Sequence, residues 1–266
     1  MPMRIPEEVL VRLRVEAIPA LESNYIWMAH DGTKAVLVDP GCAKPALAAL
    51  AEHGLKLVGI LITHHHHDHI GGLDEILNKH EVRVWGPDDD RIPQVTQTVH
   101  EGDQISIDAL KTCFHVIETP GHTRSHVVFY NDAFIFSGDT LFSLGCGRLF
   151  EGTPAQMLTS LDKVAQLNPD AQVCCGHEYT EANGHFAQLV DPHNWALAQR
   201  MESVNKLRAH GEPTLPVTLA TELQTNPFLR TRDPSLMTAV RIHDPGASTT
   251  ATDVFATLRG WKDQQP

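Results

Sequence analysis

Six consecutive side chains that can bind a metal or carry a proton stand within the first third of the sequence: His64, His65, His66, His67, Asp68 and His69. They follow an apolar run, residues 57–62, which predicts a strand buried on both faces. Functional residues concentrate at the ends of such strands. If the chain stays extended, His64 and His66 point to one side and the two other neighbouring histidines to the opposite side. Two sets of ligands can then face two neighbouring positions.

Three further candidates follow later, each in a glycine-containing loop after a predicted strand: His122, Asp139 and His177. Singly, each is more often structural than functional. Together they repeat one arrangement, a strand followed by a flexible loop that carries a histidine or an aspartate. A single tetrahedral zinc takes four ligands. The full set suits two metals about 3.5–4 Å apart that share a carboxylate.

Imidazole and carboxylate ligands without thiolate suit zinc, iron or manganese. Such metals lower the pKa of bound water to about 7 and polarise an attacked carbonyl group. Other catalytic designs have little support, because no serine-hydrolase elbow, phosphate-binding loop or dinucleotide fingerprint is present. Cys146 lacks an obvious base nearby, which argues against a cysteine nucleophile.

The elements that must position these residues change in character along the chain. Strands are expected at 24–29, 34–38, 57–62, 82–85, 113–117, 127–130, 133–136 and 172–175. Helices are expected at 45–53, 73–79, 154–167, 193–210, 234–243 and 249–262. Asp191-Pro192 is the expected start of the fourth of these helices. Strand-like runs end near residue 180, and the Pro-rich stretch 212–225 is expected to be irregular.

The composition of the 266 residues, 42% hydrophobic and 20% charged, is typical of a globular protein. The longest apolar run is too short to span a membrane, and residues 1–10 show no secretory signal, so the cytoplasm is the expected location. The net charge of −12 argues against nucleic-acid binding. Five cysteines without a C-x-x-C pair indicate reduced thiols.

The motif T-H-x-H-x-D-H followed by Gly-Gly, with the three later candidates in chain order, resembles the metallo-β-lactamase superfamily. The resemblance implies an α+β fold, a four-layer αβ/βα sandwich of two mixed sheets with metals at one edge. A small α-helical C-terminal domain is expected to follow. The expected division is a catalytic domain at 1–177 and a helical substrate-binding domain at 178–266.

Within the superfamily, nearly the whole chain resembles the glyoxalase II family. The resemblance rests on the segments Gly138-Asp139-Thr140-Leu141-Phe142, Gly145-Cys146-Gly147-Arg148, Cys175-Gly176-His177-Glu178-Tyr179-Thr180 and Asn226-Pro227-Phe228. It implies hydrolysis of the thioester S-(R)-lactoylglutathione to D-lactate and glutathione, the second step of methylglyoxal detoxification. A hydroxide bridging two metals would attack the thioester carbonyl.

The resemblance also implies a role for each ligand. The first metal would be held by His64, His66 and His122, and the second by Asp68, His69 and His177. Asp139 would bridge both metals, and Asp68 and Asp139 would act with the hydroxide in catalysis. Two divalent ions per chain are expected; zinc is the first expectation, and iron and manganese are the alternatives.

By the same resemblance, glutathione would be bound by Arg148, Phe150, His177, Tyr179, Arg259 and Lys262. A basic cluster makes physical sense, because glutathione carries two carboxylates and the chain is strongly acidic. Phe150 departs from the family pattern, in which a tyrosine often stands at this position. We expect this difference from the family pattern to affect how tightly glutathione binds.

Alternatives remain at this point. The same scaffold could carry a general thioesterase, a lactonase or a persulfide dioxygenase. A metal-storage protein without turnover is a rival from another class. The expected partner is a small glutathione thioester, with no nucleic acid and no membrane, and the chain is expected to be a monomer.

Overall fold

The computed structural model describes residues 13–265, so the expectation about a signal in residues 1–10 lies outside it. The first sheet is mixed, with strands in the order β1-β2-β3-β4-β5-β6. Neighbours pair antiparallel from β1 to β3 and parallel from β3 to β6. These strands are Arg14–Ala20, Asn24–His30, Lys34–Val38, Lys56–Leu61, Val84–Pro87 and Gln97–Val99.

The second sheet is also mixed, in the order β14-β13-β10-β9-β8-β7. Only β10 and β13 pair in parallel. In chain order, β7 to β10 are Gln104–Ile107, Thr112–Glu118, Val127–Tyr130 and Phe134–Gly138, and β13 and β14 are Gln172–Cys175 and Val217–Thr218. A short ribbon, β11 (Leu141–Phe142) with β12 (Gly145–Cys146), follows β10.

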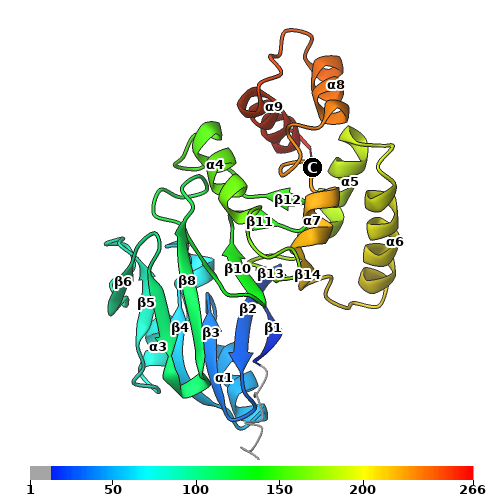
Figure 1. Cartoon of the computed structure of the whole chain (residues 1–266). Coiled ribbons are helices and arrows are strands. Elements are labelled where there is room, and N and C mark those ends of the chain that lie inside the picture. Colours follow the sequence, from blue (N-terminus) through cyan, green and yellow to red (C-terminus); the bar gives the residue numbers. More distant parts are fainter. Residues whose placement is uncertain (1–12, 266) are drawn as a thin grey trace, which may run out of the picture.

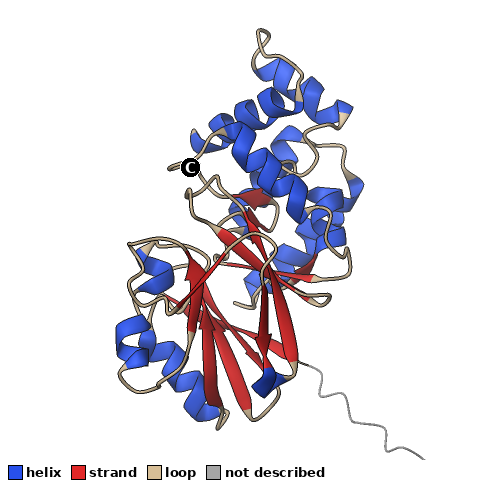
Figure 2. Ribbon diagram, turned by 60° about the vertical axis from the view of Figure 1, so that its left-hand side comes forward, coloured by secondary structure: helices blue, strands red, loops and turns tan. Residues whose placement is uncertain are grey.

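The two sheets face each other (Figure 2). Strand β2 is buried along its whole length, with Trp27 in the large core that includes the second sheet and Met28 in a separate core under the outer helices. Burial on both faces explains why the central strands read as continuous apolar runs. Helices α1 (Ala43–Glu52) and α3 (Leu73–Leu77) supply the outer side of that separate core (Figure 1).

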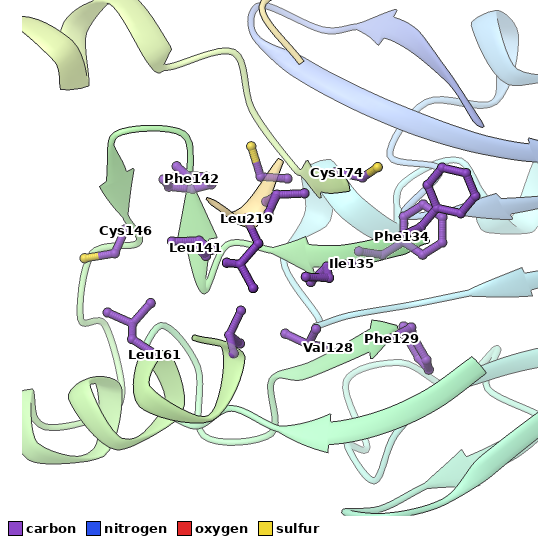
Figure 3. Packing of buried hydrophobic residues seen from close by; sticks show 14 of the residues in the cluster. Val128, Phe129, Phe134, Ile135, Leu141, Phe142, Cys146, Leu161, Cys174 and Leu219 are labelled. Atoms are coloured by element: carbon purple, nitrogen blue, oxygen red, sulfur yellow. The ribbon is translucent and has the colours of Figure 1, made fainter. Parts of the chain in front are cut away.

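The helices from α4 onward gather at the end of the sandwich where the C-terminal segment lies (Figure 1). They are α4 (Pro154–Val164), α5 (Thr180–Val190), α6 (Trp195–Ala209), α7 (Leu219–Thr225), α8 (Pro234–His243) and α9 (Ala251–Asp263). A capping box formed by Thr153 and Gln156 starts α4. Leu161 of α4 and Leu219 of α7 join Ile135 and Leu141 in the large core (Figure 3).

Two expectations for the C-terminal segment are wrong. Residues 217–225 are ordered as β14 and α7, because the apolar Leu219 is buried in the core and Thr218 caps the helix. Helix α6 starts after Asn194, whose side chain accepts from the backbone N–H of Leu197. Asp191 does not start it, because its carboxylate is engaged by Arg230. Strand β14 also carries the C-terminal segment into the second sheet.

The predicted fold class is confirmed: an α+β sandwich of two mixed sheets with outer helices and a helical C-terminal segment. All five cysteines are free thiols. Among residues 13–265, no helix combines the length and apolar composition that a bilayer crossing requires.

Candidate metal centre and substrate cavity

Three histidines converge on one point at the edge of the sandwich. His64 Nε2 lies 3.1 Å from His66 Nδ1, and His122 Nε2 lies 3.0 Å from the same atom. The first two follow β4 and the third lies in the loop between β8 and β9. These three rings form the first candidate metal cluster.

A second cluster lies beside the first. Asp68 Oδ2 is 3.5 Å from His69 Nε2 and 3.3 Å from His177 Nε2. Asp68 and His69 belong to the short helix α2 (His67–Ile70), and His177 follows β13. Asn24 Nδ2 donates to Asp68 Oδ2 at 2.9 Å and fixes the carboxylate.

Asp139 lies between the two clusters. One carboxylate oxygen is 3.3 Å from His122 Nε2 and 3.4 Å from His177 Nε2, and the other is 3.3 Å from His69 Nε2. The residue follows Gly138, whose φ of +48° and lack of a side chain bring the loop against Thr63. A carboxylate in this place can be shared by two cations.

Hydrogen bonds to the ring nitrogen that points away from a cluster determine how each histidine presents its other nitrogen to that cluster. His122 Nδ1 lies 2.8 Å from the carbonyl oxygen of Arg148, which can only accept a hydrogen bond. The proton of this ring is therefore on Nδ1, and the Nε2 lone pair points into the cluster. His69 Nδ1 pairs with Asp39 Oδ2 at 3.0 Å, and His177 Nδ1 with Ser23 Oγ at 3.0 Å. Partners of this kind orient metal-binding histidines.

The donor set fits divalent cations. His69 Nε2 and Asp139 Oδ1 are both buried and lie 3.3 Å apart, yet neither forms a hydrogen bond within the described residues. Burial and the neighbouring histidines hold the pKa of His64 well below its usual value, so this ring is neutral. Burial alone would raise the pKa of Asp139, but His69 and His177 hold it well below its usual range. In the second cluster Asp139 and Asp68 outweigh burial and raise the pKa of His177 to about 10, so a cation that binds there must displace a proton.

Asp39 is within reach of His64 and His69 and completes a third cluster. Its oxygens already accept from the backbone N–H and the hydroxyl of Thr63. It therefore supports the ligands from outside. Sequence reasoning missed Asp39, and it also missed His126, whose Nε2 accepts from the backbone N–H of Asp139. Asp39 directly follows β3, a weak signal that the strand-end rule could have used.

A cavity of about 540 Å³ connects the two clusters to the C-terminal helices. It is lined by all six residues that the sequence predicts to bind substrate, together with Asp68, Asp139 and Cys146. The structure thus brings every predicted substrate residue to one space. Of the seven predicted metal ligands, His66, Asp68, His122, Asp139 and His177 line it, and His64 and His69 lie behind them.

The cavity walls differ in chemistry. Tyr179 stacks on His177 with ring centres 4.6 Å apart and planes 3° apart. Phe150, 63% exposed, meets the rings of His66 and His122 edge-on. On the far side, Arg259 Nη1 donates to the carbonyl of Cys146 at 2.7 Å.

The thiol of Cys146 is unsuited to nucleophilic attack. It is buried, and burial raises its pKa to about 11 even though Arg259 is close by. A thiol with this pKa carries almost no thiolate at neutral pH. The structure thus agrees with the argument against a cysteine nucleophile.

Fold and site together define a class. Residues 18–177 match the Metallo-beta-lactamase superfamily, to which the chain belongs. Two solved structures share this fold at low identity. "ETHE1 from Myxococcus xanthus" is 21% identical with a TM-score of 0.62, covering 94% of this chain and 98% of that one. "BLEG-1 B3 metallo-beta-lactamase" is 22% identical with a TM-score of 0.59, covering 82% of this chain and 99% of that one.

The particular family follows from closer relatives. Residues 178–265 match "Hydroxyacylglutathione hydrolase C-terminus". The protein named hydroxyacylglutathione hydrolase from Xanthomonas campestris pv. campestris (strain B100) is 51% identical over 255 residues, covering 94% of this chain and 98% of its own length. The protein of the same name from Cupriavidus taiwanensis is 49% identical over 263 residues, with coverages of 94% and 98%. The chain belongs to the hydroxyacylglutathione hydrolase family, which confirms the resemblance found in the motifs.

Proposed function

We propose that this chain hydrolyses S-(R)-lactoylglutathione, and related S-2-hydroxyacylglutathiones, to glutathione and the free 2-hydroxy acid. One observation carries the proposal. A single cavity joins paired histidine and carboxylate clusters to the cationic side chains of Arg148, Arg259 and Lys262. The clusters suit attack on a thioester carbonyl, and the cations suit a substrate with two carboxylates.

Two divalent ions, expected to be zinc, would be held by the seven residues His64, His66, Asp68, His69, His122, Asp139 and His177. Bound there, such ions lower the pKa of water to about 7 and stabilise negative charge that develops on a carbonyl oxygen. The Asp139 carboxylate contacts both clusters, with one oxygen near His122 and His177 and the other near His69. Asp68, held by Asn24 and 38% exposed, faces the cavity, where it can orient the attacking water.

The substrate would lie with its thioester over the clusters and its peptide toward α9. Tyr179 and Phe150 flank the entrance beside the histidines. Arg148 and Arg259 offer guanidinium groups, which bind carboxylates with two parallel hydrogen bonds. The five free thiols fit a reducing compartment, which supports the cytosol as the location in this proposal. The proposal takes the chain to act as a monomer.

The decisive experiment is steady-state hydrolysis of S-D-lactoylglutathione, with a thioester of an uncharged thiol measured alongside and metal counted per chain. Chelator-sensitive turnover of the glutathione substrate alone, with two metals per chain, is expected. Equal turnover of both substrates would keep the hydrolase chemistry but remove the role of the basic residues. No turnover with metals present would refute the proposal and favour a lactonase or dioxygenase.

The Asp68→Asn variant distinguishes a hydrolase from a metal-storage protein. If the variant keeps its metal and loses hydrolysis, a storage function is excluded. Asp170→Asn is the matched control, because Asp170 is exposed and does not line the cavity.

A further inference from the structure

Asp263 is the last residue of α9, a position that disfavours a carboxylate. The C-terminal end of a helix carries partial negative charge, which favours lysine or arginine there. The Asp263 side chain is 41% exposed, so core packing does not account for its place. The reason for its position must come from the groups it faces.

Those groups are the two cavity arginines. Asp263 Oδ1 lies 3.1 Å from Arg259 Nη2 and 3.4 Å from Arg148 Nε. A carboxylate from this chain therefore occupies the space between two guanidinium groups that line the cavity. This is the place that a substrate carboxylate would take if both arginines bound it.

Arg259 cannot easily turn toward another partner. Its Nη1 is held by the carbonyl of Cys146, and its guanidinium lies 5.2 Å from the centre of the Phe228 ring. Its side chain is only 8% exposed. Arg148 (62% exposed) and Asp263 are the more exposed members of the trio. When an anion enters, Asp263 is the group that can move away at low cost.

We propose that Asp263 is a specificity-determining residue: its carboxylate stands in for the terminal carboxylate of the substrate and must be displaced when the glutathione thioester binds. This inference rests on the proposed function for the identity of the ligand, but assigns a role to a residue that the proposed function does not use. Glutathione itself carries the same carboxylates. Asp263 should therefore weaken the binding of the substrate and of the product glutathione by the same factor.

Asp263→Asn tests this competition. Because partly exposed ion pairs are weak, KM for S-lactoylglutathione should fall about two- to fivefold. The inhibition constant of glutathione should fall by the same factor, with kcat changed less than about twofold. KM for a thioester of an uncharged thiol should not change. Asp263→Glu retains the charge and should stay near the wild type.

Glu181→Gln is the matched control. Glu181 is exposed, follows Tyr179 and Thr180 at the start of α5, and forms no ion pair within the described residues. The Glu181→Gln variant removes one negative charge close to the cavity, as Asp263→Asn does, but leaves the contacts of the two arginines unchanged. A similar fall of KM in this variant would mean that overall charge, not displacement of Asp263, causes the effect, and would overturn the proposal.

Two other outcomes would also overturn it. A raised KM in Asp263→Asn would mean that Asp263 aligns the arginines for binding, and an unchanged KM would mean that it does not compete. Thermal unfolding of each variant checks that the fold is retained. Calorimetric titration with glutathione measures the displacement without turnover. If the wild type fails to hydrolyse the thioester but Asp263→Asn binds glutathione more tightly, the proposed function fails and the role of Asp263 stands.

Discussion

The buried carboxylate of Asp39 connects the two candidate clusters without belonging to either. It accepts from the hydroxyl of Thr63 at 2.6 Å and from His69 Nδ1 at 3.0 Å. Thr63 Oγ1 in turn lies 3.0 Å from His64 Nδ1. One carboxylate therefore orients one ring in each cluster, and outer partners of this kind raise the metal affinity of histidines.

Asp39→Asn should lower metal affinity and kcat by about 10–100-fold each. The charge that keeps both outer nitrogens protonated is lost, whereas the backbone is not strained, because asparagine tolerates the φ of +51° found here. Metal affinity can be measured by competition with a chromogenic chelator. Asp170→Asn serves as the control, and unchanged affinity in Asp39→Asn would contradict the role given to Asp39.

Phe150→Tyr should lower KM for the glutathione thioester about two- to tenfold, the range that one added hydrogen bond of about 0.5–1.5 kcal/mol gives. The ring lies at the cavity entrance and is largely exposed, so a hydroxyl can be added without overpacking. Steady-state kinetics measure the change. An unchanged or raised KM would count against a substrate contact at this position.

At the residue scale, the sequence predicts which side chains meet but not what supports them. The run from His64 to His69 and the three later strand-end residues could be placed at one edge, because strand ends meet there. Asp39, Asn24 and His126 could not be found in this way. Their importance depends on hydrogen bonds to residues at least 13 positions away, which no local spacing reveals.

At the element scale, the loops after the strands must come very close to the candidate ligands. Gly176, between β13 and His177, is the clearest case. A Cβ atom at this position would lie 2.6 Å from Asp139 Oδ1 and 2.7 Å from a carbon of the His69 ring. The loop can pass between the two clusters only because this residue has no side chain.

Gly176→Ala should therefore disturb the clusters more than the fold. Metal bound per chain should fall below two, and kcat should fall at least about tenfold, since a ligand shift equals or exceeds the loss of an outer partner. Far-ultraviolet circular dichroism should stay near the wild type. Gly246→Ala is a suitable control for a substituted glycine, because a Cβ there makes only an ordinary contact, 3.4 Å from Asp244 Oδ1, and the backbone does not have a positive φ. Two tightly bound metals in Gly176→Ala would contradict the prediction that a side chain at this position displaces Asp139 and His69.

The elements that could be predicted are those with strong local signals. The capping box of α4 and the apolar run of β4 are examples. Helix α7 could not be predicted from its Pro-rich surroundings, because long-range contacts stabilise it. Glu222 of α7 is buried and accepts from the hydroxyl of Ser143 at 2.7 Å and the backbone N–H of Leu144 at 2.8 Å. Those partners are almost 80 residues away in the chain.

At the scale of the whole molecule, positive charge is concentrated at one cavity although the chain is acidic overall. The chain carries a net charge of −12, yet Arg148, Arg259 and Lys262 line one cavity between the sandwich and α9. Lys262 packs its ammonium against the Phe186 ring at 5.8 Å. Burial lowers its pKa, and repulsion from the two nearby arginines lowers it further. An anionic substrate relieves that repulsion.

Recognition of the glutathione thioester should therefore depend on salt. Raising ionic strength from about 0.05 M to about 0.5 M shortens the screening length to a few ångströms and should raise KM severalfold for this substrate. The KM for a thioester of an uncharged thiol should hardly change, since it gains nothing from the cations. Lys262→Gln should weaken the salt dependence as it raises KM. If salt instead lowered KM, repulsion by the acidic chain would dominate over the local cluster, and the basic residues would not be the binding site.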